Sequence, residues 1–358
     1  MENSIKALIN SIKPLEEAAM EAARARQDTL TKPPGSLGLL EAISIRVAGI
    51  TGEAIPQIQD KAVIVMAGDH GVVAEGVSAY PSEVTPQMVY NMLAGGAAIN
   101  VLSRHAGVRT AIVDMGVAAE LEMTEGLIDK KVAPGTANMA QGPAMSREQA
   151  MRAILAGAEV FAAEAEKGLD ILATGDMGIG NTTPSAAIAV ALMDIDAQDI
   201  VGRGTGVDDA GLQRKIQAVQ SALNLNQPDP EDGLDVLAKV GGYEIGGLAG
   251  AILAAAAARR PVVVDGFIST AAAMIAVTLA PQVRDYLFSA HCSQEHGHRA
   301  MLEWLDLEAM LDFDMRLGEG TGAVLAISII EAACKVLAEM ATFAEAGVSD
   351  KEADPQPA

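Results

Sequence analysis

Apolar residues follow two alternating patterns along the chain. Short β-branched and aliphatic runs predict buried strands at 62–66, 110–114, 169–173, 261–265 and 286–290. Between them, apolar residues recur at helical spacing over 147–167, 183–193, 208–223, 243–257 and 269–279. Strands and helices that alternate in this way are typical of a parallel sheet with helices on both faces. We therefore predict an α/β fold.

Both ends of the chain lie outside this alternation. Apolar residues between Ile5 and Leu15 have helical spacing, and a long apolar helix is predicted over 322–343. If the two segments pack together, they form a small helical domain from both ends of the chain. The predicted division is a helical domain of residues 1–58 and 323–348 and an α/β domain of residues 59–322.

Two segments carry no regular pattern. Residues 116–145 mix small, polar, glycine and proline positions, which predicts a long excursion near a site or a partner. Residues 349–358 are acidic and proline-rich, and we predict that this tail is disordered.

Composition and charge narrow the class of protein. Half of the 358 residues are apolar, which suffices for a large core, and the formal net charge of -22 argues against binding nucleic acid. The only cysteines, Cys292 and Cys334, lie far apart in sequence and favour a reduced chain. The first residues lack the apolar core of a signal peptide, and the apolar run at 245–258 is too short to span a bilayer. We expect a cytoplasmic protein without a membrane span.

A glycine-rich segment after the third predicted strand is a strong candidate for an anion site. Residues 175–183 read Gly-Asp-Met-Gly-Ile-Gly-Asn-Thr-Thr and precede a helix, so several free N–H groups should point at one spot. Gly175 and Gly180 have the spacing of a P-loop, but Asn181 stands where that motif needs lysine, which disfavours an NTPase. The alternative is a tight turn that lets the helix pack closely.

A second glycine-rich segment at 202–206 precedes a helix that Asp208 can cap. Lys215 lies two turns into this helix and can reach a phosphate bound at the loop. The alternative for Lys215 is a solvated helix lysine. An acidic protein can hold one small phosphorylated ligand, because a lysine and a few backbone N–H groups suffice locally.

Glu319 lies between two glycines in Leu317-Gly-Glu-Gly-Thr-Gly322, just before the long apolar helix. A glutamate at the mouth of a helix can simply complement the helix dipole. Flanking glycines are a poor choice for stability alone, however, and a good one for letting a substrate approach the carboxylate. We therefore predict that Glu319 is functional.

The segment after the first predicted strand permits two interpretations at each polar residue. Asp69 and His70, in Gly68-Asp-His-Gly71, predict a hydrogen-bonded turn rather than a catalytic dyad. Ser82 can either cap the helix that follows or contact a ligand.

The segment His291-Cys-Ser-Gln-Glu-His-Gly-His298 is rich in residues that bind metals, but it fits no standard zinc spacing. A helix predicted over 295–305 would turn His296 away from His298. A hydrogen-bonding loop is therefore favoured, in which Ser293 is free to bind phosphate.

Several segments spread over nearly the whole chain carry a family resemblance: 32–38, 67–71, 175–183, 204–209, 265–271, 289–298 and 317–322. They resemble the nicotinate-nucleotide:dimethylbenzimidazole phosphoribosyltransferases of cobalamin biosynthesis. The resemblance implies a Rossmann-like parallel sheet, a smaller helical domain from both chain ends, and a homodimer. It also implies transfer of phosphoribose from nicotinate mononucleotide to 5,6-dimethylbenzimidazole, which gives α-ribazole 5′-phosphate and nicotinate with inversion at the anomeric carbon.

The resemblance also assigns roles to residues. Glu319 becomes the general base, and Asp176 a second catalytic carboxylate at a position where some family members carry glutamate. Around the benzimidazole it places Ser82, Met88 and Leu317, and near the nucleotide phosphate Gly178, Gly204, Lys215 and Ser293. From the same segments we expect nucleotide contacts by Gly180, Asn181, Thr205, Asp265 and Gly266.

The chemistry needs a single base. The pyridinium of the donor leaves as a neutral ring, so no acid or metal is required at the leaving group. Attack by one benzimidazole nitrogen makes the ring acidic at the other nitrogen, and a carboxylate within hydrogen-bond reach accepts that proton. Since Asp176 is shorter than glutamate, its share in catalysis is an open question. We expect no metal and no cofactor.

Two other classes of protein fit the sequence less well. Phosphoribosyltransferases that use phosphoribosyl pyrophosphate usually have an apolar strand that ends in two acidic residues, whereas Val262-Val-Val-Asp265 ends in one. A nucleotide-binding regulatory protein would keep the anion loop but would not need Glu319. The sequence does not determine which aromatic base is the acceptor, because a flat apolar pocket discriminates against a missing methyl group by only about 1–3 kcal/mol.

Overall fold

The computed structural model describes residues 1–122 and 124–349, and these contain a seven-stranded parallel sheet in the order β3-β2-β1-β4-β5-β6-β7. The strands are β1 (Lys61–Gly68), β2 (Arg109–Gly116), β3 (Leu127–Asp129), β4 (Ile171–Met177), β5 (Val262–Val264), β6 (Leu287–His291) and β7 (Ala309–Leu311). The predicted α/β fold is confirmed, and each of the predicted strands is present. The edge strands β3 and β7 were not predicted, because three residues are too short to show a periodic pattern.

The two central strands define where a ligand can bind. From β1 the sheet grows through β2 to β3 on one side, and from β4 through β5 and β6 to β7 on the other. The strand order therefore reverses between β1 and β4, and in such sheets ligands bind outside the carboxyl ends of the strands at this point. The register pairs Met66 with Asp176 and Ala67 with Met177, which brings Asp176 to that edge.

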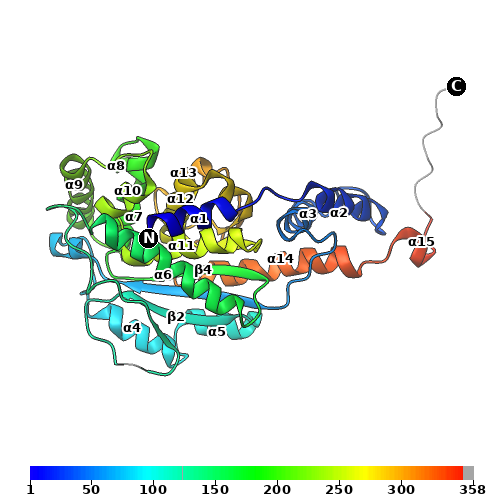
Figure 1. Ribbon diagram of the computed structural model, residues 1–358, viewed down its shortest axis with the longest axis horizontal. Coiled ribbons are helices and arrows are strands. Elements are labelled where there is room, and N and C mark those ends of the chain that lie inside the picture. The colour runs from blue at the N-terminus through cyan, green and yellow to red at the C-terminus, as the bar shows by residue number, and fades with distance from the viewer. Residues whose placement is uncertain (123, 350–358) are drawn as a thin grey trace. The chain divides into compact units, whose positions relative to one another are not determined.

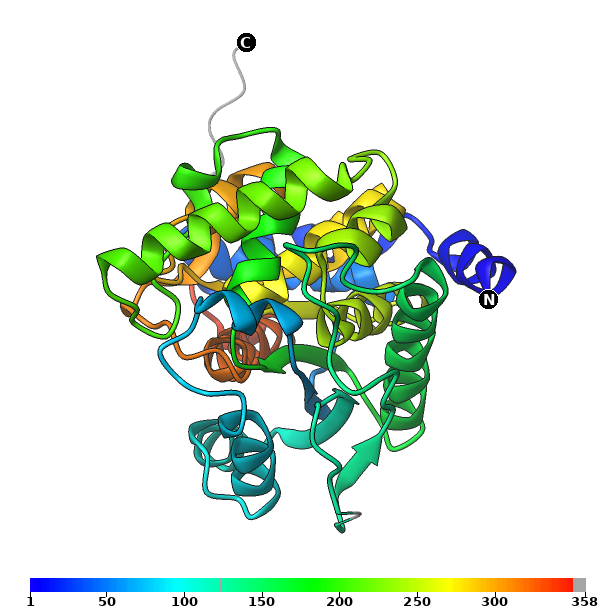
Figure 2. The same cartoon turned by 90° about the vertical axis from the view of Figure 1, so that its left-hand side faces the viewer.

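Fifteen α-helices accompany the strands in the described residues. They are α1 (Glu2–Ser11), α2 (Glu17–Thr29), α3 (Leu39–Thr51), α4 (Val84–Leu93), α5 (Ala98–Ala106), α6 (Arg147–Ala165), α7 (Thr182–Met193), α8 (Ala197–Ile200), α9 (Asp209–Asn226), α10 (Gly233–Val240), α11 (Tyr243–Ala257), α12 (Phe267–Leu279), α13 (His298–Trp304), α14 (Thr321–Glu339) and α15 (Phe343–Ala346), with short 3₁₀ turns η1 (Gly71–Glu75) and η2 (Pro281–Tyr286). Helices α11 and α12 pack on the sheet from one side, and α4 and α5 contact β1 and β2 from the other (Figure 1). Figure 2 shows α9 and the α4–α5 pair on opposite sides of the sheet.

Contacts between Cα atoms divide the chain into two compact units. The first comprises Met1–Pro14 and Gln59–Ile327 and contains the sheet, so α1 belongs with the sheet although residues 1–58 were assigned to the helical domain. The second comprises Leu15–Ile58 and the chain from Ser328 onward. Of the tail that was predicted to be disordered, residues 350–358 lie outside the described part of the chain.

In the second unit, segments from both chain ends pack together. Ala23 and Ala48 form a buried cluster with Leu337, and the Arg26 guanidinium donates hydrogen bonds to the carbonyl oxygens of Leu337 and Ala338 at 2.5 and 2.9 Å. Lys32 forms a buried ion pair with Glu41, with 2.8 Å between Nζ and Oε1. These contacts hold together a small helical unit that contains none of the seven strands.

Among the described helices, α14 is long and apolar enough to cross a membrane, with a mean hydropathy of 1.8. In the fold, 56% of that stretch is buried. A mostly buried core helix has the same composition, so this helix is weak evidence for a membrane span.

Glycines set the distance between α6 and α11, which lie side by side in the first unit. A Cβ atom on Gly157 would overlap the carbonyl group of Gly247, and one on Gly250 would overlap the carbonyl oxygen of Ile154. The two helix backbones are therefore nearly in contact, and α11 is almost completely buried. Small residues compensate here for the shortage of large aromatic side chains.

We predict that Gly250→Ala lowers the free energy of unfolding by about 2 kcal/mol, because overpacking costs about 1–3 kcal/mol or more and the higher helix propensity of alanine returns only part of it. Urea unfolding measures the change. Gly142→Ala is the matched control, because a Cβ atom there meets no atom within 4 Å. Equal stability of the two variants would contradict the close approach of α6 and α11.

Candidate active site

A cavity of about 490 Å³ lies at the carboxyl ends of the central strands, where the strand order reverses. Its lining comes from the β4–α7 turn, the loops at 204–205, 266–268 and 291–295, the loop before α14, and α4. Of the residues predicted for the site, it brings together Met88, Asp176, Gly178, Asn181, Gly204, Thr205, Gly266, Ser293, Leu317 and Glu319.

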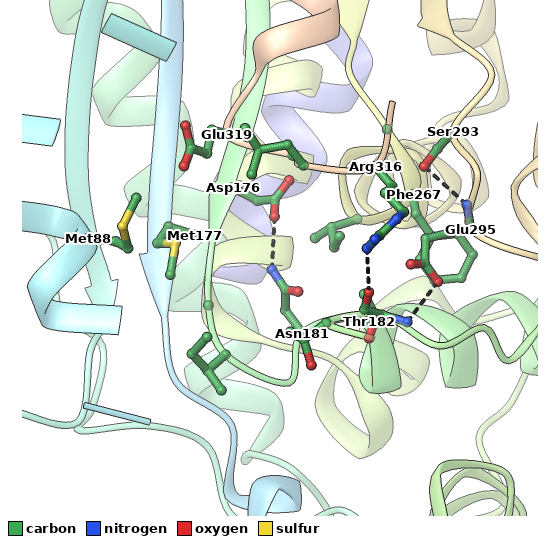
Figure 3. Close-up of a pocket in the computed structure, with 18 of the residues that line it drawn as sticks. Met88, Asp176, Met177, Asn181, Thr182, Phe267, Ser293, Glu295, Arg316 and Glu319 are labelled. Atoms are coloured by element: carbon green, nitrogen blue, oxygen red, sulfur yellow. Dashed lines mark hydrogen bonds between the residues drawn. The ribbon is translucent and has the colours of Figure 1, made fainter. Parts of the chain in front are cut away.

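The two ends of the cavity differ in chemistry. Met88 and Met177 lie near Glu319 at one end, and Ser293, Glu295 and Arg316 lie at the other (Figure 3). Asp176 and Asn181 lie between them (Figure 3). A ligand with a flat apolar ring and a distant anionic group matches this arrangement.

Glu319 is held by a strained turn. Its φ angle is 65°, and its neighbours Gly318 and Gly320 have φ angles of 83° and 91°. Left-handed backbone is unfavourable for a residue with a side chain, and such strain is typical of functional sites. The turn lies directly on β4, because a Cβ atom on Gly175 would lie 2.5 Å from the carbonyl oxygen of Glu319. The glycines thus serve geometry as well as access.

The Glu319 carboxylate is buried at 4% exposure but lines the cavity. Burial raises its pKa above the ordinary value, and a hydrogen bond from the backbone N–H of Ile99 to Oε2, at 3.3 Å, opposes this shift. Ile99 lies in the first turn of α5, where the helix dipole also favours a negative charge. The result is a carboxylate that can bind a proton more readily than an exposed glutamate.

Asp265 anchors this loop instead of lining the cavity. Its carboxylate accepts hydrogen bonds from the backbone N–H groups of Gly320 and Ala323, at 3.1 and 2.9 Å, and it is completely buried. Burial raises its pKa to about 7 against the effect of these hydrogen bonds. Asp265 does not line the cavity, and its oxygens are used by the loop, so its contact with the nucleotide stays a prediction that this geometry does not support.

Asp176 lies in the middle of the cavity. Asn181 donates a hydrogen bond from Nδ2 to Oδ2 of Asp176 at 2.9 Å, while the buried Oδ1 has no hydrogen-bond partner among the described residues. Burial, and then repulsion by Asp265 and other carboxylates, raises the pKa of Asp176 well above its ordinary value. The raised pKa favours the protonated form of Asp176, which can donate a hydrogen bond.

Lys215 supplies a buried cation behind the polar end. Its Nζ donates to Oγ1 of Thr182 at 2.8 Å, and a Cβ atom on Gly204 would lie 2.7 Å from Nζ. Burial lowers the pKa of Lys215 to about 8, and the nearby Glu295 carboxylate opposes that shift. The interpretation of Lys215 as a solvated helix lysine is wrong, since the side chain is completely buried. Asp208 caps α9, as predicted.

The β4–α7 turn offers fewer free N–H groups than predicted. The N–H of Ile179 donates to Thr85, that of Asn181 to Gly178, and that of Thr183 to Gly180. These three N–H groups already donate hydrogen bonds within the protein. The alternative of a tight turn therefore describes this part of the segment better than an anion site does.

Two other predicted residues do not line the cavity. A Cβ atom on Gly180 would meet Val73, so this glycine serves close packing of η1. Ser82 does not cap α4 with its side chain, because the N-cap residue is Glu83 and the backbone carbonyl of Ser82 accepts the N–H of Thr85.

The histidine-rich segment forms a hydrogen-bonded network. The N–H of Ser293 donates to Nδ1 of His298 at 2.8 Å, and Nε2 of His298 lies 2.9 Å from Oγ1 of Thr270, which donates to the carbonyl oxygen of Gly266. Burial, and then the nearby His291, lowers the pKa of His298 to about 3, so the ring is neutral. The network fixes Ser293 and Gly266 at the cavity. Among residues 1–122 and 124–349, no group of three or more His, Cys, Asp or Glu is arranged to hold a metal ion.

Several lining residues were not predicted, among them Tyr80, Met177, Thr182, Phe267, Glu295 and Arg316. Arg316 lies three residues before Glu319, so a charged residue next to a functional loop could have drawn attention to it. Phe267 and Glu295 lie close in sequence to the predicted residues Gly266 and Ser293, but only the fold shows that their own side chains line the cavity.

Comparisons with known proteins agree with the geometry. The profile of a phosphoribosyltransferase family matches residues 12–348. The chain is 59% identical over 347 residues to the nicotinate-nucleotide–dimethylbenzimidazole phosphoribosyltransferase of Chloroflexus aurantiacus, covering 97% of this chain and 99% of the relative. The protein of that name from Roseiflexus sp. strain RS-1 is 61% identical over 343 residues, covering 96% and 97%.

Two solved structures resemble the fold of this chain over almost its full length. The crystal structure of the enzyme of the same name from Thermus thermophilus superposes with a TM-score of 0.90 at 49% identity, covering 94% of this chain and 100% of that one. A second structure from that organism has a TM-score of 0.90 at 51% identity, covering 93% and 100%. Family profile, relatives and fold thus agree along almost the full length. The chain belongs to the nicotinate-nucleotide–dimethylbenzimidazole phosphoribosyltransferase family.

Proposed function

We infer that this protein transfers phosphoribose from nicotinate mononucleotide to 5,6-dimethylbenzimidazole, giving α-ribazole 5′-phosphate and nicotinate for the lower ligand of cobalamin. The observation that carries this assignment is the placement of Glu319 at a methionine-lined end of the cavity, with a buried lysine behind the opposite end. A flat base and a phosphate can then be bound at the same time.

The acceptor is placed against Met88, Met177 and Leu317. Methionine side chains are flexible and polarisable, so they can pack on the faces of an aromatic ring. One ring nitrogen then attacks the anomeric carbon while the other faces Glu319. As the C–N bond forms, the ring loses its proton to the Glu319 carboxylate.

The donor phosphate is placed at Gly178, Gly204, Thr205 and Ser293, with the Lys215 ammonium behind Gly204. The hydroxyl groups of Thr205 and Ser293 can donate to phosphate oxygens, and the buried lysine supplies the charge. The C–N bond to the pyridinium breaks with its electron pair moving to the ring nitrogen, so the leaving ring needs no proton. Asp176 lies between the two ends and can donate a hydrogen bond to the ribose or base.

A nucleotide-binding regulatory protein and an enzyme that uses phosphoribosyl pyrophosphate are both less well supported. Glu319 and its strained turn have no task in a protein that only binds a nucleotide. The single acidic residue at the end of β5, Asp265, is used by the loop before α14 rather than facing the cavity. A homodimer and a cytoplasmic location remain predictions from the family resemblance and the sequence.

Purified protein should release nicotinate only when dimethylbenzimidazole is present, with or without EDTA. Glu319→Gln should lower kcat by about 10²–10⁴-fold, because the amide keeps the size of the side chain but accepts no proton. Liquid chromatography of both products measures the rate. A fully active Glu319→Gln protein would show that another group is the base.

The pH dependence should report the same carboxylate. Glu319 acts when deprotonated, and its raised pKa predicts that kcat/KM falls with decreasing pH at a higher pH than for an ordinary glutamate. Glu319→Gln should lack this acid limb.

Asp176→Asn should keep kcat within roughly threefold, because a protonated aspartic acid and asparagine both offer a hydrogen-bond donor at this depth. Steady-state kinetics with both substrates tests this. A loss of about 100-fold or more would instead assign Asp176 a charged role in the reaction.

We propose further that Arg316 binds the carboxylate of the nicotinate ring. Among the described residues that line the cavity, it is the only arginine or lysine, and it is exposed. It also borders a second cavity of about 460 Å³ that shares Gly204 and Glu295 with the first and has apolar walls at Val201, Leu212 and Ile216. That cavity offers room for the ring on the side away from the methionines.

Arg316→Met should therefore raise KM for nicotinate mononucleotide by about tenfold or more, since a hydrogen bond to a charged group contributes about 1.5–3 kcal/mol. Any turnover of nicotinamide mononucleotide, which lacks the carboxylate, should be unchanged. The ratio of kcat/KM for the two donors measures the effect. An equal loss for both donors would place Arg316 at the phosphate.

A further inference from the structure

A buried ion pair lies beneath the floor of the cavity. Nε2 of His70 and Oε1 of Glu244 are 2.8 Å apart, and their side chains are 1% and 0% exposed. His70 follows the end of β1, and Glu244 lies in the first turn of α11, where the helix dipole favours its negative charge. Neither residue lines the cavity or takes part in the reaction described above.

Backbone approaches connect this pair to the donor end of the cavity. Gly178, which lines the cavity, is so close to the end of β1 that a Cβ atom on it would overlap the carbonyl oxygen of Gly68 and lie 3.4 Å from Nε2 of His70. A Cβ atom on Gly68 or Gly242 would lie 2.8 or 2.6 Å from Oε2 of Glu244. The pair is therefore enclosed by three backbone segments: the end of β1, the turn after β4, and the start of α11.

Stability alone is a poor reason for such a pair. Two charges lose much of their attraction to the desolvation that burial imposes, and apolar residues of the same size often stabilise a protein equally well. A role in positioning neighbouring backbone is therefore the better explanation for the pair. One of the segments next to it is the turn that carries Gly178.

We propose that His70 and Glu244 are positioning residues: a buried imidazolium–carboxylate pair that fixes the β4–α7 turn against the end of β1 and so sets where Gly178 meets the phosphoribosyl group of the donor. This inference rests on the placement of the donor phosphate given above. It requires His70 to be charged in the working enzyme.

The surrounding charges support that state. Burial alone lowers the pKa of His70, but the charge and hydrogen bond of Glu244 and the charge of Asp69 outweigh it, and the net pKa is raised. The charges that raise it belong to Asp69, in the same loop as His70, and to Glu244 on α11. Asp176 on β4 lies close enough to Glu244 for that carboxylate to raise its pKa. These three groups are all acids. Because the folded pKa is raised, the contribution of the pair is fully present below the ordinary pKa of histidine and is lost as the pH rises through the raised pKa.

The kinetic test uses His70→Gln, Glu244→Gln and the double variant. Each should raise KM for nicotinate mononucleotide by about tenfold, because a small misplacement of a binding group is costly, and should leave KM for dimethylbenzimidazole within about twofold. The double variant should equal the single ones, because the pair acts as a unit. His70→Gln should also lose the alkaline limb of kcat/KM for the donor.

Glu164→Gln is the matched control. Glu164 is a buried carboxylate of α6 with Lys167 and Arg109 as cationic partners, and it does not line the cavity. This variant should change the melting temperature without changing either KM. The inference is overturned if the His70 and Glu244 variants behave in the same way as Glu164→Gln.

A second measurement needs no variant. In protein labelled with ¹³C at histidine Cε1, a pH titration should show that His70 keeps its proton to a higher pH than an ordinary histidine, and a ring that loses its proton at a lower pH than an ordinary histidine would overturn the proposal. A rise in KM for the base alone would also overturn it, together with the placement of phosphate at Gly178, but would leave the transfer reaction itself intact.

Discussion

The buried carboxylate of Asp265 holds the loop that carries Glu319, and the form of the cavity depends on it. Its two oxygens accept the N–H groups of Gly320 and Ala323, while its own N–H donates to Oγ1 of Thr174 on β4. One side chain thus connects β5, β4 and the start of α14. Backbone groups at the start of a helix lack partners within the helix, and Asp265 satisfies two of them in a place that water does not reach. The position of Glu319 follows from these bonds.

The same region concentrates negative charge. Asp176, Asp265, Glu244 and Glu319 are all buried near the carboxyl ends of the central strands. Burial raises the pKa of Asp176, Asp265 and Glu319. Like charges in a medium of low dielectric constant repel strongly unless some of them bind protons. A donor with a cationic pyridinium is attracted to such a site. The ring that leaves is neutral at its nitrogen and carries a carboxylate, so the same field that draws the donor in favours release of the product.

The sequence predicted the fold well, because buried parallel strands and amphipathic helices leave regular patterns. It also drew attention to Glu319, which lines the cavity, because a carboxylate between glycines contributes little to the start of a helix. It did not predict that Asp265 and Gly180 lie outside the cavity lining: their type and neighbourhood suggested ligand contacts, whereas their partners come from segments distant in sequence. Arg316 and the pairing of His70 with Glu244 were missed for the same reason, since 174 positions separate the latter two in the chain and only the sheet topology brings them together.

The left-handed backbone of Glu319 restricts how this enzyme can change during evolution. A glutamate occupies that conformation only where its surroundings enforce it, and here the enforcement comes from glycines on both sides and from a glycine beneath the turn. Substitutions at these glycines would displace the base before they altered any contact with the substrates. The acceptor end, lined by pliable methionines, is free of this restriction. New acceptor bases can therefore be recruited by mutation around a catalytic turn that stays the same.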